Sequence, residues 1–253
     1  MQKNNIVGIV ALFLILAGIV LYAALRPAPA KAPDAANLPL PAGDFAEHAP
    51  YYDITANYAT STPLRGSAND AAIALMQNFV ADTITQFKTD GNFSNLTPQD
   101  ITMMGFDRGR KEKLNIVYLV FSSPRTISYV FTTYLDTLGA HGNMFFHTFT
   151  FNTATGAPIS LADLFLPGTD YLGKLSALAR ADLPAVIGPD ATDARMINDG
   201  TTPEDKNFSS FFIDNGTLCI LFAPYAVAPY SAGPQTLQIP LSELSSILKP
   251  EYR

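Results

Sequence analysis

The sequence predicts an α+β fold: an antiparallel sheet meander with two main helices, preceded by one N-terminal transmembrane helix. Three observations lead to this prediction. Residues 6–25 are uncharged and nearly all apolar. Beyond them, strand-like segments follow one another in runs instead of alternating strictly with helices, which is typical of α+β proteins. Helical periodicity marks only two long stretches, near residues 69–88 and 172–184.

The apolar N-terminal stretch is interpreted as a transmembrane signal anchor within residues 1–26. At ~1.5 Å per residue, a helix over residues 6–25 spans about 30 Å, the thickness of the hydrocarbon core of a bilayer. A secretory signal has a shorter apolar region of roughly 7–15 residues. A cleaved signal and a buried core helix remain the alternatives. Only residues 1–5 precede the stretch, so we expect the rest of the chain to be exported.

A linker is predicted between the anchor and the folded part, over residues 27–50. This segment is rich in proline and alanine, which favours an extended, semi-rigid spacer. It also contains His48, one of three histidines in the chain. We expect the linker to hold the folded domain away from the membrane.

Residues 51–155 are predicted to form the N-terminal part of the exported domain. A strand over residues 53–63 is followed by a helix that Asn69-Asp70 can cap and that runs to residue 88. Three strands are then expected over residues 114–121, 126–135 and 144–152. In the last of them, four alternate residues share one face of the sheet: Phe145, His147, Phe149 and Phe151.

Residues 156–253 form the predicted C-terminal part. After a turn at residues 153–156, we expect a helical turn at 161–165, a helix that Pro184 ends, and a polar loop or short helix over residues 188–207. Asn215-Gly216 between two apolar runs predicts a β-hairpin. The second run is apolar on both sides, which indicates a central strand. A loop rich in Pro, Gly and Tyr (223–234), a return strand and a short helix from Pro240 complete the chain.

Several of these segments together resemble a known family. The segments are 138–143 (LGAHGN), 146–151 (FHTFTF), 161–165 (LADLF), 222–234 (FAPYAVAPYSAGP) and 239–244 (IPLSEL). They are similar to the envelope domain of the RsiV-like family, which includes the ectodomain of the anti-sigma factor RsiV and the non-catalytic region preceding the deacetylase domain of PdaC. In RsiV this domain recognises lysozyme, and in PdaC-like proteins it accompanies peptidoglycan modification. The resemblance implies an extracytoplasmic domain over residues 51–248.

Charge and chain organisation narrow the range of partners. The 16 basic residues include Lys3 and Arg26, so the chain after Arg26 carries 14 basic and 22 acidic side chains, a net charge of −8. This balance argues against nucleic acid and is compatible with a cationic partner. No sigma factor is expected, because residues 1–5 are too short to hold one. The deacetylase domain of PdaC-like proteins has no counterpart here.

Few residues suggest catalysis or metal binding. A metal site or an acid–base pair built on His141 and His147 would need a third ligand or an orienting carboxylate, and only Asp136 is near in sequence. The structural interpretation is that His141 bonds the backbone of its loop and that His147 is a satisfied core histidine. Cys219, the only cysteine, is expected to be buried and inert. No catalytic residue, metal site or cofactor is predicted.

Four residues are candidates for ligand binding: His141, Asn143, Tyr225 and Tyr230. Rigid tyrosines in a Pro-rich loop provide a large contact area at low entropic cost, although such a loop can also be a purely structural crossover. The sequence thus predicts a single-pass, membrane-anchored binding module of the bacterial cell envelope that recognises peptidoglycan or a protein ligand such as lysozyme. The alternatives are an envelope glycan-modifying enzyme or its accessory subunit, and an assembly partner of another membrane protein.

Overall fold

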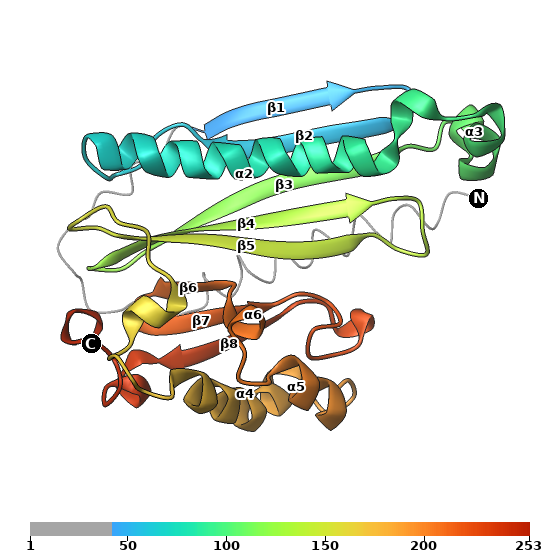
Figure 1. Ribbon diagram of the computed structural model, residues 1–253. Helices are drawn as coiled ribbons and strands as arrows, with labels where there is room; N and C mark the ends of the chain where they lie inside the picture. The colour runs from blue at the N-terminus through green and yellow to red at the C-terminus, as the bar shows by residue number, and fades with distance from the viewer. Residues whose placement is uncertain (1–41) are drawn as a thin grey trace. The chain divides into compact units, whose positions relative to one another are not determined.

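The computed structural model describes residues 42–253, which form an α+β domain with two β-sheets. Helix α2 (Ser67–Gly91) covers part of one face of a five-stranded sheet (Figure 1). A three-stranded sheet lies on the other side, and helices α4 (Tyr171–Ile187) and α5 (Ala194–Gly200) lie beyond it (Figure 1). The predicted anchor and most of the predicted linker fall outside the described residues. Within residues 42–253, no helix is both long enough and apolar enough to cross a bilayer.

The five-stranded sheet follows the chain order β1-β2-β3-β4-β5. Its strands are β1 (Ala42–His48), β2 (Tyr52–Ala59), β3 (Glu112–Ser122), β4 (Thr126–Asp136) and β5 (Asn143–Asn152). All neighbouring pairs are antiparallel except β2 and β3, which are parallel. The prediction of a purely antiparallel meander was therefore wrong at this one pair. The chain leaves β2 and returns to β3 through a long connection that contains helices, and parallel strands require such a crossover.

Strand β1 occupies residues that the sequence analysis placed in the linker. It pairs along its whole length with β2, from Ala42 opposite Ala59 to His48 opposite Asp53. Glu47 of β1 accepts a 2.5 Å hydrogen bond from the Tyr52 hydroxyl and forms a 2.6 Å ion pair with Lys88 of α2. Only Phe45 is a large apolar residue in this strand, which is why its sequence resembles the preceding linker.

Helix α2 (Ser67–Gly91) is the longest helix among residues 42–253, and it begins before the predicted cap. Gly66 is the N-cap residue, while the Asn69 side chain accepts hydrogen bonds from the backbone and hydroxyl of Thr62. The helix ends at Asn92, which adopts a left-handed conformation with φ 45°. Its buried residues pack on the sheet within one core cluster that includes Met76, Val80, Phe87, Ile54, Leu114 and Ile116.

Short helical elements connect α2 to β3. They are η1 (Phe93–Asn95), α3 (Pro98–Met104) and η2 (Phe106–Arg108). A capping box between Thr97 and Asp100 starts α3, and Gly105 in the left-handed region ends it. This connection brings Glu112 opposite Tyr52 at the start of the parallel pair.

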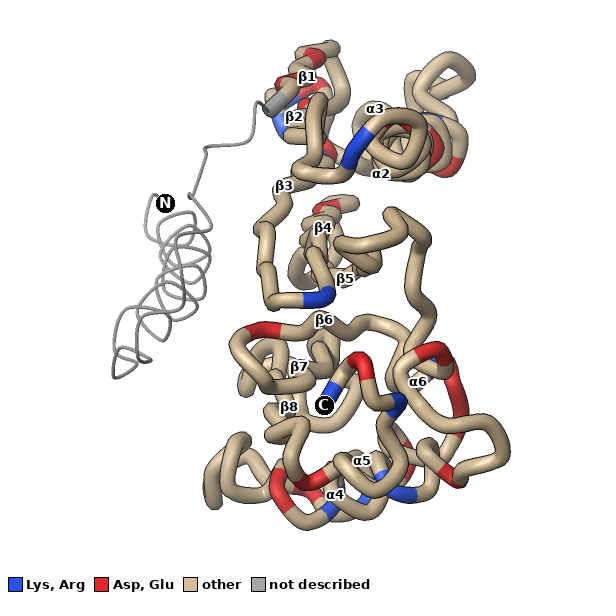
Figure 2. The backbone as a smooth tube through the Cα atoms, turned by 90° about the vertical axis from the view of Figure 1, so that its left-hand side faces the viewer, with Lys and Arg blue, Asp and Glu red and all other residues tan. Residues whose placement is uncertain are grey.

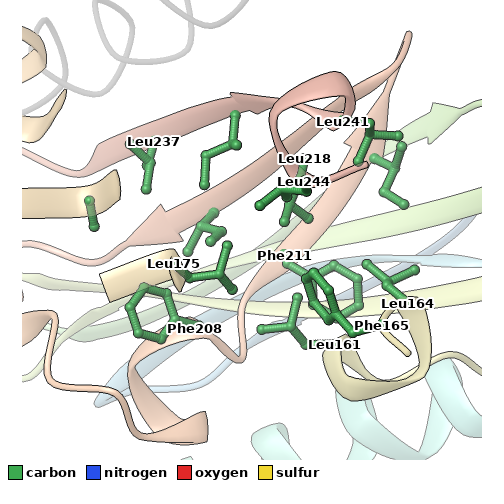
Figure 3. Close-up of a cluster of buried hydrophobic side chains, with 14 of the residues drawn as sticks. Leu161, Leu164, Phe165, Leu175, Phe208, Phe211, Leu218, Leu237, Leu241 and Leu244 are labelled. Atoms are coloured by element: carbon green, nitrogen blue, oxygen red, sulfur yellow. The ribbon is translucent and has the colours of Figure 1, made fainter. Parts of the chain in front are cut away.

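The three-stranded sheet has the order β6-β7-β8, with β6 (Phe211–Asp214), β7 (Thr217–Phe222) and β8 (Gln235–Pro240). Asn215 and Gly216 have φ values of 45° and 77°, so the predicted hairpin turn is confirmed. The central position of β7 is also confirmed. One of its faces packs into a large apolar cluster with residues from η3 (Leu161–Leu164), α4 (Tyr171–Ile187) and η5 (Leu241–Leu244) (Figure 3).

Proline does not end α4 as the sequence analysis expected. Pro184 lies inside the helix, which continues to Ile187. Leu183 is fully buried, and the Thr192 hydroxyl donates to the carbonyls of Pro184 and Gly188, which holds this last turn in place. The following polar segment contains two short helices, α5 (Ala194–Gly200) and α6 (Asp205–Phe208).

The second face of β7 packs against the large sheet. Phe212 stacks on Phe121 with ring centroids 4.1 Å apart, and Cys219 packs with Val130 and Phe212. Cys219 is 1% exposed, so its predicted burial is confirmed. The Ser210 hydroxyl donates to the Phe146 carbonyl, which adds a polar link between β5 and the start of β6. The two sheets are thereby joined by a small apolar interface and a polar margin.

Candidate binding surface

The loop between β4 and β5 carries the first part of the candidate site. Asp136 Oδ1 accepts a 2.9 Å hydrogen bond from the Leu138 amide, and Leu138 itself has a φ of 64°. The Arg110 guanidinium donates to the Leu138 carbonyl at 3.1 Å. These bonds fix the tight turn that places His141 at the end of the sheet.

The loop between β7 and β8 carries the second part. It contains Tyr225 and ends in the helical turn η4 (Tyr230–Ala232). Tyr225 has a φ of 71°, a conformation that a bulky residue rarely adopts. The end of α5 lies against this loop, because a β-carbon added at Gly200 would collide with the carbonyl of Ala226. Glycine at this position therefore allows the helix and the loop to approach closely.

Three predicted residues meet where these loops converge, and we call His141, Tyr225 and Tyr230 the aromatic patch. The His141 ring stacks on Tyr230 with centroids 3.8 Å apart and an interplanar angle of 22°. The His141 Nε2 atom lies 3.3 Å from the Tyr225 hydroxyl oxygen. The Tyr230 hydroxyl donates to the Gly142 carbonyl at 2.7 Å. The patch thus links two segments more than 80 residues apart in the chain.

The hydrogen bonds also fix the tautomer of neutral His141. Its Nδ1 atom lies 3.1 Å from the Gly142 carbonyl oxygen, which can only accept. Nδ1 therefore carries the proton, and Nε2 accepts a hydrogen bond from the Tyr225 hydroxyl. The expected backbone bond of His141 is present, and the side chain in addition positions Tyr225.

The residues of the patch differ in accessibility. Tyr225 is 56% exposed and His141 is also exposed, whereas Tyr230 is half-buried. Burial, followed by the proximity of Tyr225 and Asp136, raises the pKa of Tyr230 above its usual value. Asn143, the fourth candidate, is exposed at the first position of β5, where it pairs with Leu135. It lies beside the patch in sequence, and within residues 42–253 its side chain forms no hydrogen bond with the patch.

His147 is not the core histidine that the sequence analysis expected. Its ring stacks on Phe79 of α2 with centroids 4.5 Å apart and also contacts Phe149, while the residue as a whole is exposed. Burial of the ring between these aromatic groups lowers its pKa. Among residues 42–253, no side chain hydrogen-bonds either ring nitrogen. His141 and His147 do not converge on a shared site, since they contact different partners.

The remaining histidine and the acidic side chains make local contacts. His48 bonds Asp53 at 2.9 Å, and Asp53 also forms an ion pair with Lys111 at 3.0 Å. In the part of the chain that the structure describes, no group of three His, Cys, Asp or Glu residues could hold a metal ion. Acidic positions are distributed over several elements, including α2 and the region around α4 to α6 (Figure 2).

Sequence reasoning missed the residues that support the patch from behind. A β-carbon at Gly142 would clash with the end of the Tyr134 ring, so glycine lets the loop lie on that tyrosine without displacing it. Burial and nearby Asp136 raise the pKa of Tyr134. The signal was present in the sequence, because Gly142 lies between the two candidates His141 and Asn143.

The C-terminal part of the chain matches a known family over residues 162–242, described as "Protein of unknown function (DUF3298)". The chain is 31% identical over 199 residues to Peptidoglycan-N-acetylmuramic acid deacetylase PdaC of Bacillus subtilis, which covers 78% of this chain and 40% of that protein. It is 29% identical over 119 residues to Esterase Rv3036c of Mycobacterium tuberculosis, covering 47% and 51%. The chain therefore spans about half, or less, of the length of these relatives.

Two solved structures share the fold at low sequence identity. A DUF3298 family protein from Pseudomonas aeruginosa PAO1 has a TM-score of 0.50 at 15% identity, covering 85% of this chain and 97% of that one. A DUF3298 family member from Bacteroides fragilis has a TM-score of 0.55 at 16% identity, covering 83% and 94%. The finer resemblance to RsiV stays a prediction. The chain is thus similar to the DUF3298 family over residues 162–242 and, over a longer region, to part of PdaC.

Proposed function

We propose that this protein is a membrane-anchored binding module on the outer side of the cell membrane, and that the aromatic patch contacts a cationic protein such as lysozyme. The observation that carries the proposal is the conformation of Tyr225. A bulky residue at φ 71° is strained, and 56% of this side chain is exposed. Strain of this kind is a reason to look for a function, since it costs of order 1–3 kcal/mol and persists only where the surroundings enforce it.

Charge supports a cationic partner. The chain after Arg26 has a net charge of −8, and Asp136 lies close enough to influence Tyr230. Opposite charges increase the rate of encounter, while an exposed aromatic anchor provides specificity. The homology to PdaC supports a location in the cell envelope, and the name of that protein makes peptidoglycan a second ligand to test.

The proposal is tested by titration calorimetry of the full chain in detergent against lysozyme, with cytochrome c as a control of similar basicity. We expect Tyr225→Ala to weaken lysozyme binding at least about tenfold, as for a central aromatic anchor. Met103→Ala, which removes a 70% exposed side chain far from the patch in sequence, is the matched control and should change nothing. Equal weak binding to both proteins, unchanged by Tyr225→Ala, would contradict the proposal.

Tyr225 is a sharper probe than Tyr230. Truncating Tyr230 would also remove the stacking on His141 and the bond to Gly142, so that lost binding and lost structure could not be separated. The proposed topology has its own test. A C-terminal alkaline phosphatase fusion should be active and should fractionate with membranes, whereas an inactive fusion would contradict export.

Hydrolysis of an acyl ester is a second candidate function, which the name of the esterase relative favours. In the structure, the two ring nitrogens of His141 bond the Gly142 carbonyl and the Tyr225 hydroxyl. A p-nitrophenyl ester assay of the full chain separates the two candidates. Turnover above background that His141→Ala abolishes would favour the hydrolase, and turnover unaffected by that substitution would point to a contaminating activity.

A further inference from the structure

A groove between α2 and the face of the five-stranded sheet that this helix covers has no role in the proposed function. Helix α2 packs mainly on β2 and β3, and its Phe79 also contacts Phe131 of β4 and Phe149 of β5. Phe145, near the start of β5, stays exposed beside the helix. The groove between α2 and these strands has a volume of about 370 Å³. The groove is open to solvent, so a ligand would lie along it and stay partly exposed.

The groove combines an aromatic wall with a polar helix face. Phe145 projects from β5 and is 51% exposed, although it lies on the sheet face that is buried farther along the same strand at Phe151. His147, the next residue on the same face of β5, packs on Phe79 of α2. The exposed ring is therefore available to a ligand on one side of the groove.

The helix side of the groove accepts hydrogen bonds and carries negative charge. Asp82, Gln86 and Asp90 line it, and Thr133 adds a hydroxyl from β4. The Gln86 amide donates to Asp90 at 2.7 Å, which leaves its carbonyl oxygen free to accept. Among residues 42–253, Asp82 has no hydrogen-bond or ion-pair partner. Lys88, the single cation of α2, is engaged by Glu47 of β1.

We propose that this groove binds a short glycan whose sugar units carry free amino groups. An ammonium group can pair with the unpartnered Asp82 carboxylate, and a cation over the face of Phe145 gains further attraction. Sugar hydroxyls supply the donors that the oxygen-rich lining requires. The absence of a cationic side chain from the lining disfavours phosphorylated or carboxylated ligands.

The spacing of the Asp82 and Asp90 carboxylates indicates that the glycan ligand has several sugar units. Asp82 and Asp90 are eight positions apart on one helix, so they are separated by about 12 Å along its axis. A single ammonium cannot contact both at this separation. The two carboxylates therefore pair with different units of one chain, while Gln86 lies between them.

The inference is tested by titrating the full chain in detergent with glucosamine tetramer and with N-acetylglucosamine tetramer. We expect the free-amine oligomer to bind at least about tenfold more tightly, because acetylation removes the charge that pairs with Asp82. Phe145→Ala and Asp82→Asn should each weaken binding about tenfold. Val186→Ala and Asp190→Asn are the matched controls, because they remove an exposed apolar and an exposed acidic side chain elsewhere.

Three outcomes would overturn the inference. The first is equal affinity for the two oligomers, and the second is indifference to both groove substitutions. The third is equally tight binding of tetralysine with the same response to the variants, which would make the groove a site for basic peptides. Because Tyr225 is not part of the groove, failure of this test leaves the proposal for the aromatic patch standing, and the reverse also holds.

Discussion

The two faces of the five-stranded sheet are covered in different ways. On one face, the three-stranded sheet packs through Phe212, Cys219 and Val130, and Phe121 stacks on Phe212. On the other face, α2 covers β2 and β3 but leaves Phe145 half exposed beside an open groove. Apolar residues thus stabilise the fold on both faces, while Phe145 at the margin of the α2 face remains available to a ligand. Phe212 and Phe145 are the same residue type, so their different roles follow from whether another element covers them.

A matched pair of phenylalanine substitutions tests most directly whether the two faces differ in this way. Phe212→Ala should lower the free energy of unfolding by about 3–5 kcal/mol, because it leaves a cavity between the two sheets. Phe145→Ala should lower it by about 1 kcal/mol or less, since the ring is already half in water. Chemical denaturation of both variants measures the difference, and similar losses would show that Phe145 is structural.

A buried acidic residue, Glu112, lies on the α2 side of the sheet at the start of β3, where it is 7% exposed. Burial, and then nearby Asp136, raises its pKa above the value in the unfolded chain. The folded state therefore favours the protonated form of Glu112. The loss of stability caused by ionising this carboxyl is absent below the unfolded pKa of about 4.3 and fully present above the folded pKa. Glu112→Gln should stabilise the protein at neutral pH.

The pH dependence provides the control for Glu112→Gln. Its stabilising effect should shrink as the pH falls and disappear below about pH 4. Thermal unfolding of both proteins at pH 7.5 and pH 4 measures this. If the stabilisation by Glu112→Gln instead grew as the pH fell, a raised pKa of Glu112 would be contradicted. We expect this effect to exceed that of removing the buried Tyr129 hydroxyl, because burying an ionised carboxylate costs more free energy than burying a neutral hydroxyl.

Tyr129 tests the packed core under α2. Its side chain is fully buried, and its hydroxyl has no hydrogen-bond partner among the described residues. Tyr129→Phe should raise the free energy of unfolding by about 1 kcal/mol, because the desolvation penalty of an unpaired hydroxyl is removed. Denaturant titration measures the change, and a loss of stability would show that the hydroxyl is satisfied by a buried water.

The smallest effects are expected in the aromatic patch. Tyr230→Phe removes the bond to the Gly142 carbonyl and should cost about 0.5–1.5 kcal/mol. Tyr225→Gly relieves the positive φ while losing the contact with His141, so stability should change by no more than about 0.5 kcal/mol. Thermal unfolding would separate the two. A larger loss for Tyr225→Gly would make this residue structural and remove the main support for the proposed function.

Local signals in the sequence predicted much of the fold. Asn215-Gly216 indicated the hairpin, and the two-sided apolar pattern of β7 indicated a central strand. The alternation in β5 placed Phe145 and Phe151 on one face, as observed. Features that depend on distant partners were missed. The parallel pairing of β2 with β3 and the strand β1 rest on contacts that no local pattern encodes.

The candidate site divides in the same way. His141, Tyr225 and Tyr230 were nominated on motif and residue type, and the structure brings them together. Their mutual contacts could not be read from the sequence, because the two loops approach only when the sheets pack. His147 was expected in the core because it alternates with phenylalanines, but the path of α2 decides its exposure. The role of the site in binding stays a prediction.

The contact between the two loops has a consequence for quality control of the protein. Because His141 and Tyr225 lie 84 positions apart, in the predicted N-terminal and C-terminal parts of the domain, neither part can display the complete surface by itself. A partner that requires both residues would ignore nascent, clipped or half-assembled molecules and respond only to a finished domain. Recognition would then report that folding is complete as well as that the protein is present.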